Sequence, residues 1–99
     1  MLLIRDIMYC KPGKVRPMVE KFLAMRKLSS MQGMGPSRLM TDVSAERYWT
    51  VVVEFEVESM DKFMAMAPGA EEMKEMEKIM AGYHDLVDYG RREIYKIEG

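Results

Sequence analysis

One stretch of alternating residues, 48–57, constrains the fold more than any other part of the chain. Every second residue on one side of it is apolar, in the series Trp49, Val51, Val53, Phe55 and Val57. The other side carries Tyr48, Thr50, Val52, Glu54 and Glu56. Successive side chains of a strand point to opposite faces of a sheet, so this spacing predicts a strand with one wholly apolar face. We expect that face to lie beneath helices.

The remaining segments predict two helices and three further strands. Residues 2–10 are apolar around Arg5 and Asp6 and end at a Pro-Gly turn, which is typical of a strand. Apolar spacing of three and four predicts helices over residues 14–28 and 59–82. Ser59 is the expected N-cap of the second helix, and Pro68-Gly69 should break it. Residues 29–36 are expected to form a loop, and residues 38–43 and 86–97 the other two strands.

The order β-α-β-β-α-β is that of a split βαβ unit. It predicts an α+β fold, a four-stranded antiparallel sheet with both helices on one face. Ninety-nine residues supply one hydrophobic core, so we expect a single domain over residues 1–99.

The second face of the sheet also needs a cover. It carries Tyr48, Val52 and Met40, together with tyrosines of the last strand and either Ile7 or Met8. Leaving this much apolar area in water is unfavourable for a small monomer. Pairing with the same face of a second chain would bury it, which predicts a two-fold homodimer.

Charge and composition exclude several classes of partner. Fifteen basic and sixteen acidic side chains give a net charge of −1, so no nucleic-acid partner is expected. No apolar run approaches the roughly 18 residues of a membrane span, and no leader is evident, so we expect a cytoplasmic protein. The single Cys10 and single His84 offer no metal-ligand spacing, and we expect neither a metal nor a cofactor.

Polar residues on three adjacent strands form the first candidate ligand site. Arg5, Glu54 and Arg91 can share one face, although the sequence leaves open whether Arg5 or Asp6 points that way. Tyr9 and Tyr89 would flank them. The group is either an ion-pair network that fixes dimer register or a lining for a small acidic or phenolic ligand. Glu54 should have an arginine partner. If that pair is fully buried, Glu54→Ala should lower the free energy of unfolding by about 3–5 kcal/mol.

The second candidate site lies between the sheet and the second helix, near Pro68-Gly69. The chain has 13 methionines, which serve either as core filler or as an adaptable wall for an apolar ligand, Met64 among them. Trp49 is either a core anchor or a flat wall for an aromatic ligand. His84 is either a helix-end cation or a general base, and Cys10 either an inert or a reactive thiol.

Several segments resemble the dimeric α/β-barrel superfamily of ferredoxin-like proteins. They are residues 10–14 (CKPGK), 41–44 (TDVS), 50–59 (TVVVEFEVES) and 90–95 (GRREIY). The resemblance is greatest to uncharacterised NIPSNAP-like and antibiotic-biosynthesis-monooxygenase-like members. It implies either a small-molecule-binding protein or a cofactor-independent monooxygenase or isomerase acting on an aromatic or polycyclic substrate. The haem-degrading and quinone-forming branches use an asparagine, and this chain has none, which argues against haem cleavage.

Overall fold

The computed structural model describes residues 1–28, 37–65 and 69–99. Its elements, in chain order, are β1 (Leu2–Cys10), α1 (Val15–Met25), β2 (Ser37–Thr41), β3 (Thr50–Val57), α3 (Met60–Ala65), α4 (Ala70–Met80), the short 3-10 helix η1 (Tyr83–Asp85) and β4 (Val87–Lys96). The predicted loop at residues 29–36 and Pro68 lie outside the described residues.

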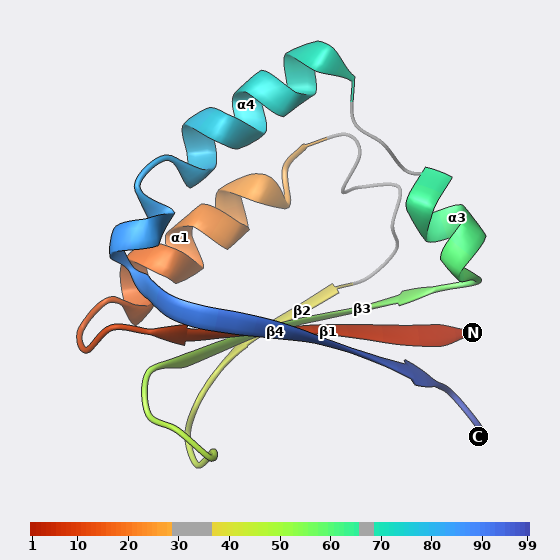
Figure 1. Cartoon of the computed structure of the whole chain (residues 1–99), viewed down its shortest axis with the longest axis horizontal. Helices are drawn as coiled ribbons and strands as arrows, with labels where there is room; N and C mark the ends of the chain where they lie inside the picture. The colour runs from red at the N-terminus through yellow and green to blue at the C-terminus, as the bar shows by residue number, and fades with distance from the viewer. Residues whose placement is uncertain (29–36, 66–68) are drawn as a thin grey trace.

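The four strands form one antiparallel sheet in the order β2-β3-β1-β4. The central strand β1 places Arg5 opposite Glu54 of β3 and opposite Glu93 of β4. Helices α1, α3 and α4 all lie on one side of the sheet, and the β2–β3 connection extends on the other (Figure 1). This arrangement confirms the predicted ferredoxin-like α+β fold.

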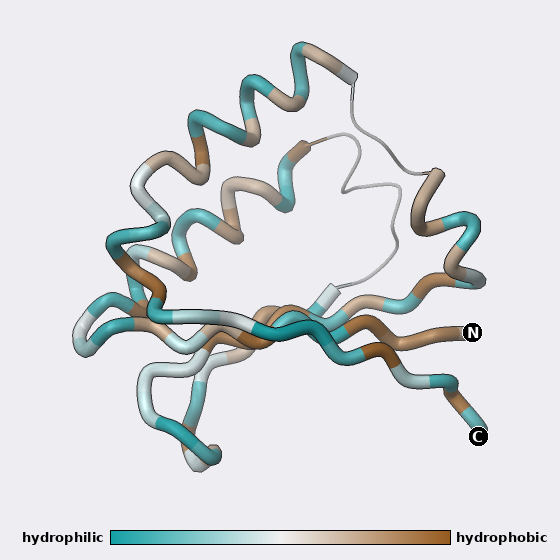
Figure 2. Tube along the Cα trace, in the orientation of Figure 1, coloured by the Kyte–Doolittle hydropathy of each residue, from teal (hydrophilic) through white to brown (hydrophobic). Residues whose placement is uncertain are grey.

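Two separate helices occupy the segment expected to hold an interrupted one. Ser59 caps α3, because its Oγ accepts a hydrogen bond from the backbone N–H of Lys62 at 3.2 Å. Gly69 immediately precedes α4, and Gly82 adopts the left-handed conformation just beyond its end, with φ of 81°. Hydrophilic and hydrophobic residues alternate along α4, as expected of a helix with one face toward the protein (Figure 2).

The core lies between the sheet and the helices. One buried cluster consists of Cys10, Met18, Val19 and Val51. A second consists of Ile4, Phe55 and Val57, with Phe63 of α3 packed against it. The rings of Phe55 and Phe63 are 5.8 Å apart between centroids. Because these residues come from both central strands, α1 and α3, they fix which face of the sheet the helices cover.

The strand expected from residue 48 begins instead at Thr50, and the interpretation of Trp49 as a core anchor was wrong. Trp49 has φ of 63°, a left-handed conformation that interrupts the alternation. Its side chain is 43% exposed, so it is not a core anchor. The backbone N–H of Thr50 donates to Asp42 Oδ1, and its Oγ1 donates to the Arg47 carbonyl, both at 2.8 Å. These two bonds close the loop before the strand starts.

Candidate functional site

A buried carboxylate marks the centre of the sheet face that carries no helix. Glu54 is only 6% exposed. Arg5 donates to its Oε2 from Nε at 2.9 Å and approaches the same oxygen with Nη2 at 2.8 Å. Arg38 Nη2 lies 3.7 Å from Oε1. The hydrogen bond to Glu54 raises the pKa of the Arg5 guanidinium. The arginine partner predicted for Glu54 is therefore present, and Arg5 rather than Asp6 points to this face.

The ionic contacts continue into β4. Arg5 Nη1 lies 3.7 Å from Glu93 Oε1, and Arg91 Nη2 lies 3.3 Å from Glu93 Oε2. One guanidinium, that of Arg5, thus bridges carboxylates from the two strands that flank β1. We refer to Arg5, Arg38, Glu54, Arg91 and Glu93 as the outer network. Each of its carboxylates has an arginine partner, so the face carries charge without an unpaired buried ion.

Two tyrosines extend the outer network toward the β2–β3 loop. The rings of Tyr9 and Tyr89 lie 4.9 Å apart between centroids. Arg47, from the loop, places its Cζ 4.8 Å from the Tyr9 centroid and 5.1 Å from that of Tyr89, and pairs with Asp88 at 3.8 Å. Tyr9 is only 3% exposed although no helix covers it. Arg47 helps to cover it through cation–π contact. Sequence patterns missed Arg47, because a loop residue has no periodicity.

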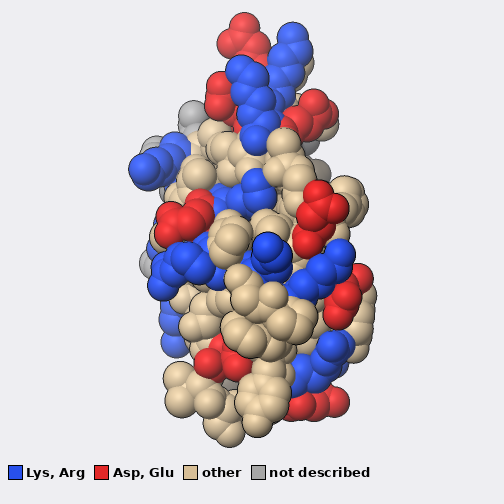
Figure 3. Space-filling view, turned by 90° about the vertical axis from the view of Figure 1, so that its left-hand side faces the viewer, with Lys and Arg blue, Asp and Glu red and all other residues tan. Residues whose placement is uncertain are grey.

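Basic and acidic side chains are mixed on the side of the molecule that lies to the left in Figure 1. Figure 3 shows Lys and Arg beside Asp and Glu, with uncharged surface toward the β2–β3 loop. That loop exposes Val43 and Tyr48 at 101% and 86%. On the face that Figure 3 shows, basic and acidic side chains are interspersed, in agreement with the chain's net charge of −1.

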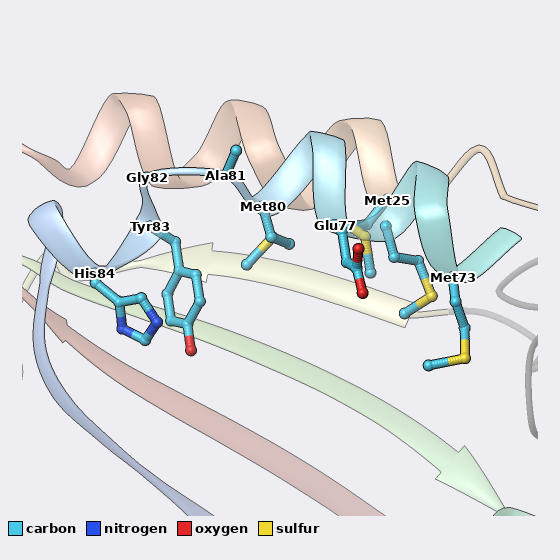
Figure 4. Close-up of a pocket in the computed structure, with 9 residues that line it drawn as sticks. Met25, Met73, Glu77, Met80, Ala81, Gly82, Tyr83 and His84 are labelled. Carbon is cyan, nitrogen blue, oxygen red and sulfur yellow. The ribbon is translucent and has the colours of Figure 1, made fainter. Parts of the chain in front are cut away.

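A methionine-lined hollow lies at the carboxyl-terminal end of α4 and has a volume of about 460 Å³ (Figure 4). Its lining comes from α1, α4 and η1 and consists of Met25, Met73, Met76, Glu77, Met80, Ala81, Gly82, Tyr83 and His84. Lys21 of α1 donates to the carbonyls of Ile79 and Ala81 at 3.0 and 2.7 Å, which holds the two helices together here. The Tyr83 and His84 rings lie 4.0 Å apart between centroids. The hollow is therefore apolar, with a few polar groups.

The other predicted site residues lie apart from this hollow. Met64 is 73% exposed on α3, and Trp49 lies at the start of β3. Cys10 is buried in the core, and burial raises the pKa of its thiol, with the Asp42 charge adding to the effect. Such a thiol is typical of an inert cysteine.

Within residues 1–28, 37–65 and 69–99, no three His, Cys, Asp or Glu side chains cluster so that they could hold a metal ion. In the same segments, no helix has the length and apolar character needed to cross a membrane.

A further ion pair, which sequence reasoning left unassigned, lies on the helix side of the sheet. Arg92 donates to both oxygens of Asp6, from Nε to Oδ1 at 2.6 Å and from Nη2 to Oδ2 at 3.0 Å. These hydrogen bonds raise the pKa of the Arg92 guanidinium. The signal was available: Asp6 falls two residues from Ile4 and Met8, both on the helix side.

Solved structures with similar folds come from small bacterial proteins. A NIPSNAP family protein of unknown function from Agrobacterium tumefaciens has a TM-score of 0.77 and 13% identity, over 98% of this chain and 87% of that one. An uncharacterised NIPSNAP domain protein from Burkholderia xenovorans has a TM-score of 0.72 and 13% identity, over 99% and 95%. A putative antibiotic biosynthesis monooxygenase from Chloroflexus aurantiacus has a TM-score of 0.63 and 14% identity, over 99% and 94%. No protein-family model matches the sequence, and a comparison with curated proteins finds no match. At these identities the likeness establishes a shared fold.

Proposed function

We propose that this protein binds a small apolar or aromatic molecule in the methionine-lined hollow. The observation that carries the proposal is the lining: four methionines line one side of an open hollow of about 460 Å³, a volume within the range of ligand pockets. Thioether side chains adapt to irregular apolar shapes. Glu77, Tyr83 and His84 supply the few polar groups that would orient the molecule.

Fluorescence of N-phenyl-1-naphthylamine, a neutral apolar probe, tests this binding. We expect a saturable fluorescence increase with the wild-type protein and a several-fold weaker affinity for Met76→Gln, which places an amide in the lining. The matched control is Met60→Gln, because Met60 is 38% exposed on α3 and lies outside the hollow. Equal affinities for the two variants, or no saturable signal from the wild type, would contradict the proposal.

We propose further that two copies pair through the outer face of the sheet, as a homodimer in the cytoplasm. Tyr89 and Tyr95 are 54% and 47% exposed on this face, and Ile7 and Val52 lie between them and β2. The charges of the outer network are already paired, so covering them strands no ion. A stable interface should bury more than about 1,000 Å² in total.

Sedimentation velocity at micromolar concentration tests the dimer. We expect twice the chain mass of 11.5 kDa for the wild type and a shift to monomer for Val52→Asp. Met64→Asp is the control, since Met64 is exposed on the helix side. A wild type that sediments as a monomer would refute the proposal.

A second candidate function is cofactor-independent oxygenation or isomerisation of an aromatic or polycyclic substrate. The adjacent Tyr83 and His84 rings at the hollow favour it, because an imidazole can take a proton from an acidic C–H or phenol. The similarity to a putative antibiotic biosynthesis monooxygenase points the same way. Oxygen consumption with anthrone as substrate should exceed the uncatalysed rate and fall at least tenfold in His84→Gln. A rate equal to background would leave binding as the function.

A further inference from the structure

The ion pair of Asp6 and Arg92 is unusual for its surroundings. Asp6 is flanked along β1 by Ile4 and Met8, which belong to the two core clusters on the helix side. The Arg92 guanidinium lies 5.4 Å from the ring centroid of Phe63 on α3. The Asp6 side chain is 19% exposed and that of Arg92 is 49% exposed. A polar pair thus opens to solvent between the two apolar core clusters.

Packing does not explain this pair. Ion pairs that are open to solvent typically contribute little to the free energy of unfolding, so stability gives little reason to keep charges here. The geometry is bidentate, with Nε and Nη2 of Arg92 matched to the two Asp6 oxygens. Asp6 therefore fixes the orientation of the guanidinium, and Nη1 takes no part in this contact.

Arg5 on the opposite face shows what the second edge of such a guanidinium can do. Arg5 holds Glu54 with Nε and Nη2, and a second carboxylate, that of Glu93, approaches its Nη1 at 3.7 Å. Arg92 holds Asp6 with the same two nitrogens. Among the described residues, however, Arg92 has no second carboxylate partner. Arg92 thus resembles Arg5 in holding one carboxylate through Nε and Nη2, but it has no counterpart of Glu93 among the described residues.

We propose that the Nη1 edge of Arg92 binds the carboxylate of a small aromatic acid, in the position that Glu93 takes beside Arg5. The acid's apolar body would lie against Phe63 and Ile94, which is 42% exposed and shares the helix side with Arg92. Arg92 supplies a charge-assisted hydrogen bond, and Asp6 acts as a positioning residue that holds the guanidinium. The inference does not depend on the methionine-lined hollow.

Titration with benzoate, followed by NMR of the ¹⁵N-labelled arginine Nε–H groups, tests the proposal. We expect a saturable shift of the Arg92 signal with benzoate and none with the neutral analogue benzamide. Arg92→Met should weaken benzoate binding by about tenfold or more, the effect of losing one charged hydrogen bond. Arg91→Met is the matched control, because Arg91 is the neighbouring arginine on the opposite face and should leave the affinity unchanged.

Two further variants separate binding from folding. Asp6→Leu/Arg92→Met removes both charges, and it should keep the urea midpoint of the wild type while losing benzoate binding. Arg92→Lys keeps the charge without the planar fork, and it should bind benzoate several-fold more weakly than the wild type. The proposal is overturned by equal binding of benzoate and benzamide, by no shift at Arg92, or by loss of binding in Arg91→Met alone.

Discussion

Substituting Glu54 tests whether the outer network is a buried structural feature. Glu54→Ala removes the acceptor that holds the Arg5 guanidinium at 2.8 and 2.9 Å. The side chain of Glu54 is 7% exposed, whereas that of Arg5 is 36% exposed. The variant therefore leaves the Arg5 guanidinium without its main partner. This group still has partial access to water and a second acid, Glu93, at 3.7 Å.

The expected loss follows from this partial exposure. A fully buried pair broken on one side costs about 3–5 kcal/mol. A charged hydrogen bond with a partly hydrated partner is worth about 1.5–3 kcal/mol, and Glu93 compensates for some of it. We expect Glu54→Ala to lower the free energy of unfolding of an isolated chain by about 1–3 kcal/mol. A dimer that covers this face would raise the loss toward the higher range, because it removes the water that hydrates Arg5.

Urea unfolding monitored by circular dichroism provides the measurement, repeated over a range of protein concentrations. The control is Glu56→Ala, an exposed glutamate on the same face of the same strand, expected to change stability by less than about 0.5 kcal/mol. The double variant Arg5→Met/Glu54→Leu should recover most of the loss. Equal stability of Glu54→Ala and Glu56→Ala would refute the assignment of Glu54 as a buried ionic centre.

Three further outcomes follow from the structure. Burial raises the pKa of the Cys10 thiol, so this group ionises at lower pH in the unfolded chain than in the folded one. The free energy of unfolding should therefore fall as the pH rises above the ordinary thiol pKa of about 8.5. Cys10→Ala should lack this decline between about pH 7.5 and 9.5 in urea titrations. Gly90→Ala should cost about 1–3 kcal/mol in thermal melts, because its Cβ would lie 2.7 Å from Met8 Sδ, and a smaller residue at Met8 should recover part of the loss. Lys21→Met should cost about 1–2 kcal/mol and speed amide exchange at the end of α4, since it removes donors to two carbonyls.

The sheet and its buried acid could be predicted because alternation is a local property of the sequence. β1 has the predicted bounds, and the alternation from Val51 to Val57 places Glu54 opposite the helix side. Once the strand order is known, Arg5 falls beside Glu54 by register alone. The separation of the second helical segment into α3 and α4 was also predictable, from the helix-breaking Pro68-Gly69 pair.

Residues whose roles depend on loop geometry could not be predicted in this way. Alternation placed Trp49 under the helices, but Asp42 ends the loop by accepting the Thr50 N–H, and Trp49 turns into the left-handed region. Arg47 reaches Tyr9 and Tyr89 only because the β2–β3 connection folds over the outer face. Neither contact has a periodic signature, because the first closes a short loop between Asp42 and Thr50 and the second joins a loop residue to strands distant in sequence.

Both faces of the sheet carry arginine–carboxylate pairs, but the arginines differ in how many acidic partners they have. On the outer face, every carboxylate of the network has an arginine, and Arg5 has acids at both edges, so the face can be covered by apolar contact without stranding charge. On the helix side, Arg92 is held by Asp6 through Nε and Nη2, and its side chain as a whole is half exposed. A guanidinium with carboxylates at both edges adds rigidity and fixes the strand register. One with a carboxylate at a single edge keeps N–H donors that can bind a solute. This difference is the reason for proposing self-association at the outer face and anion recognition on the helix side.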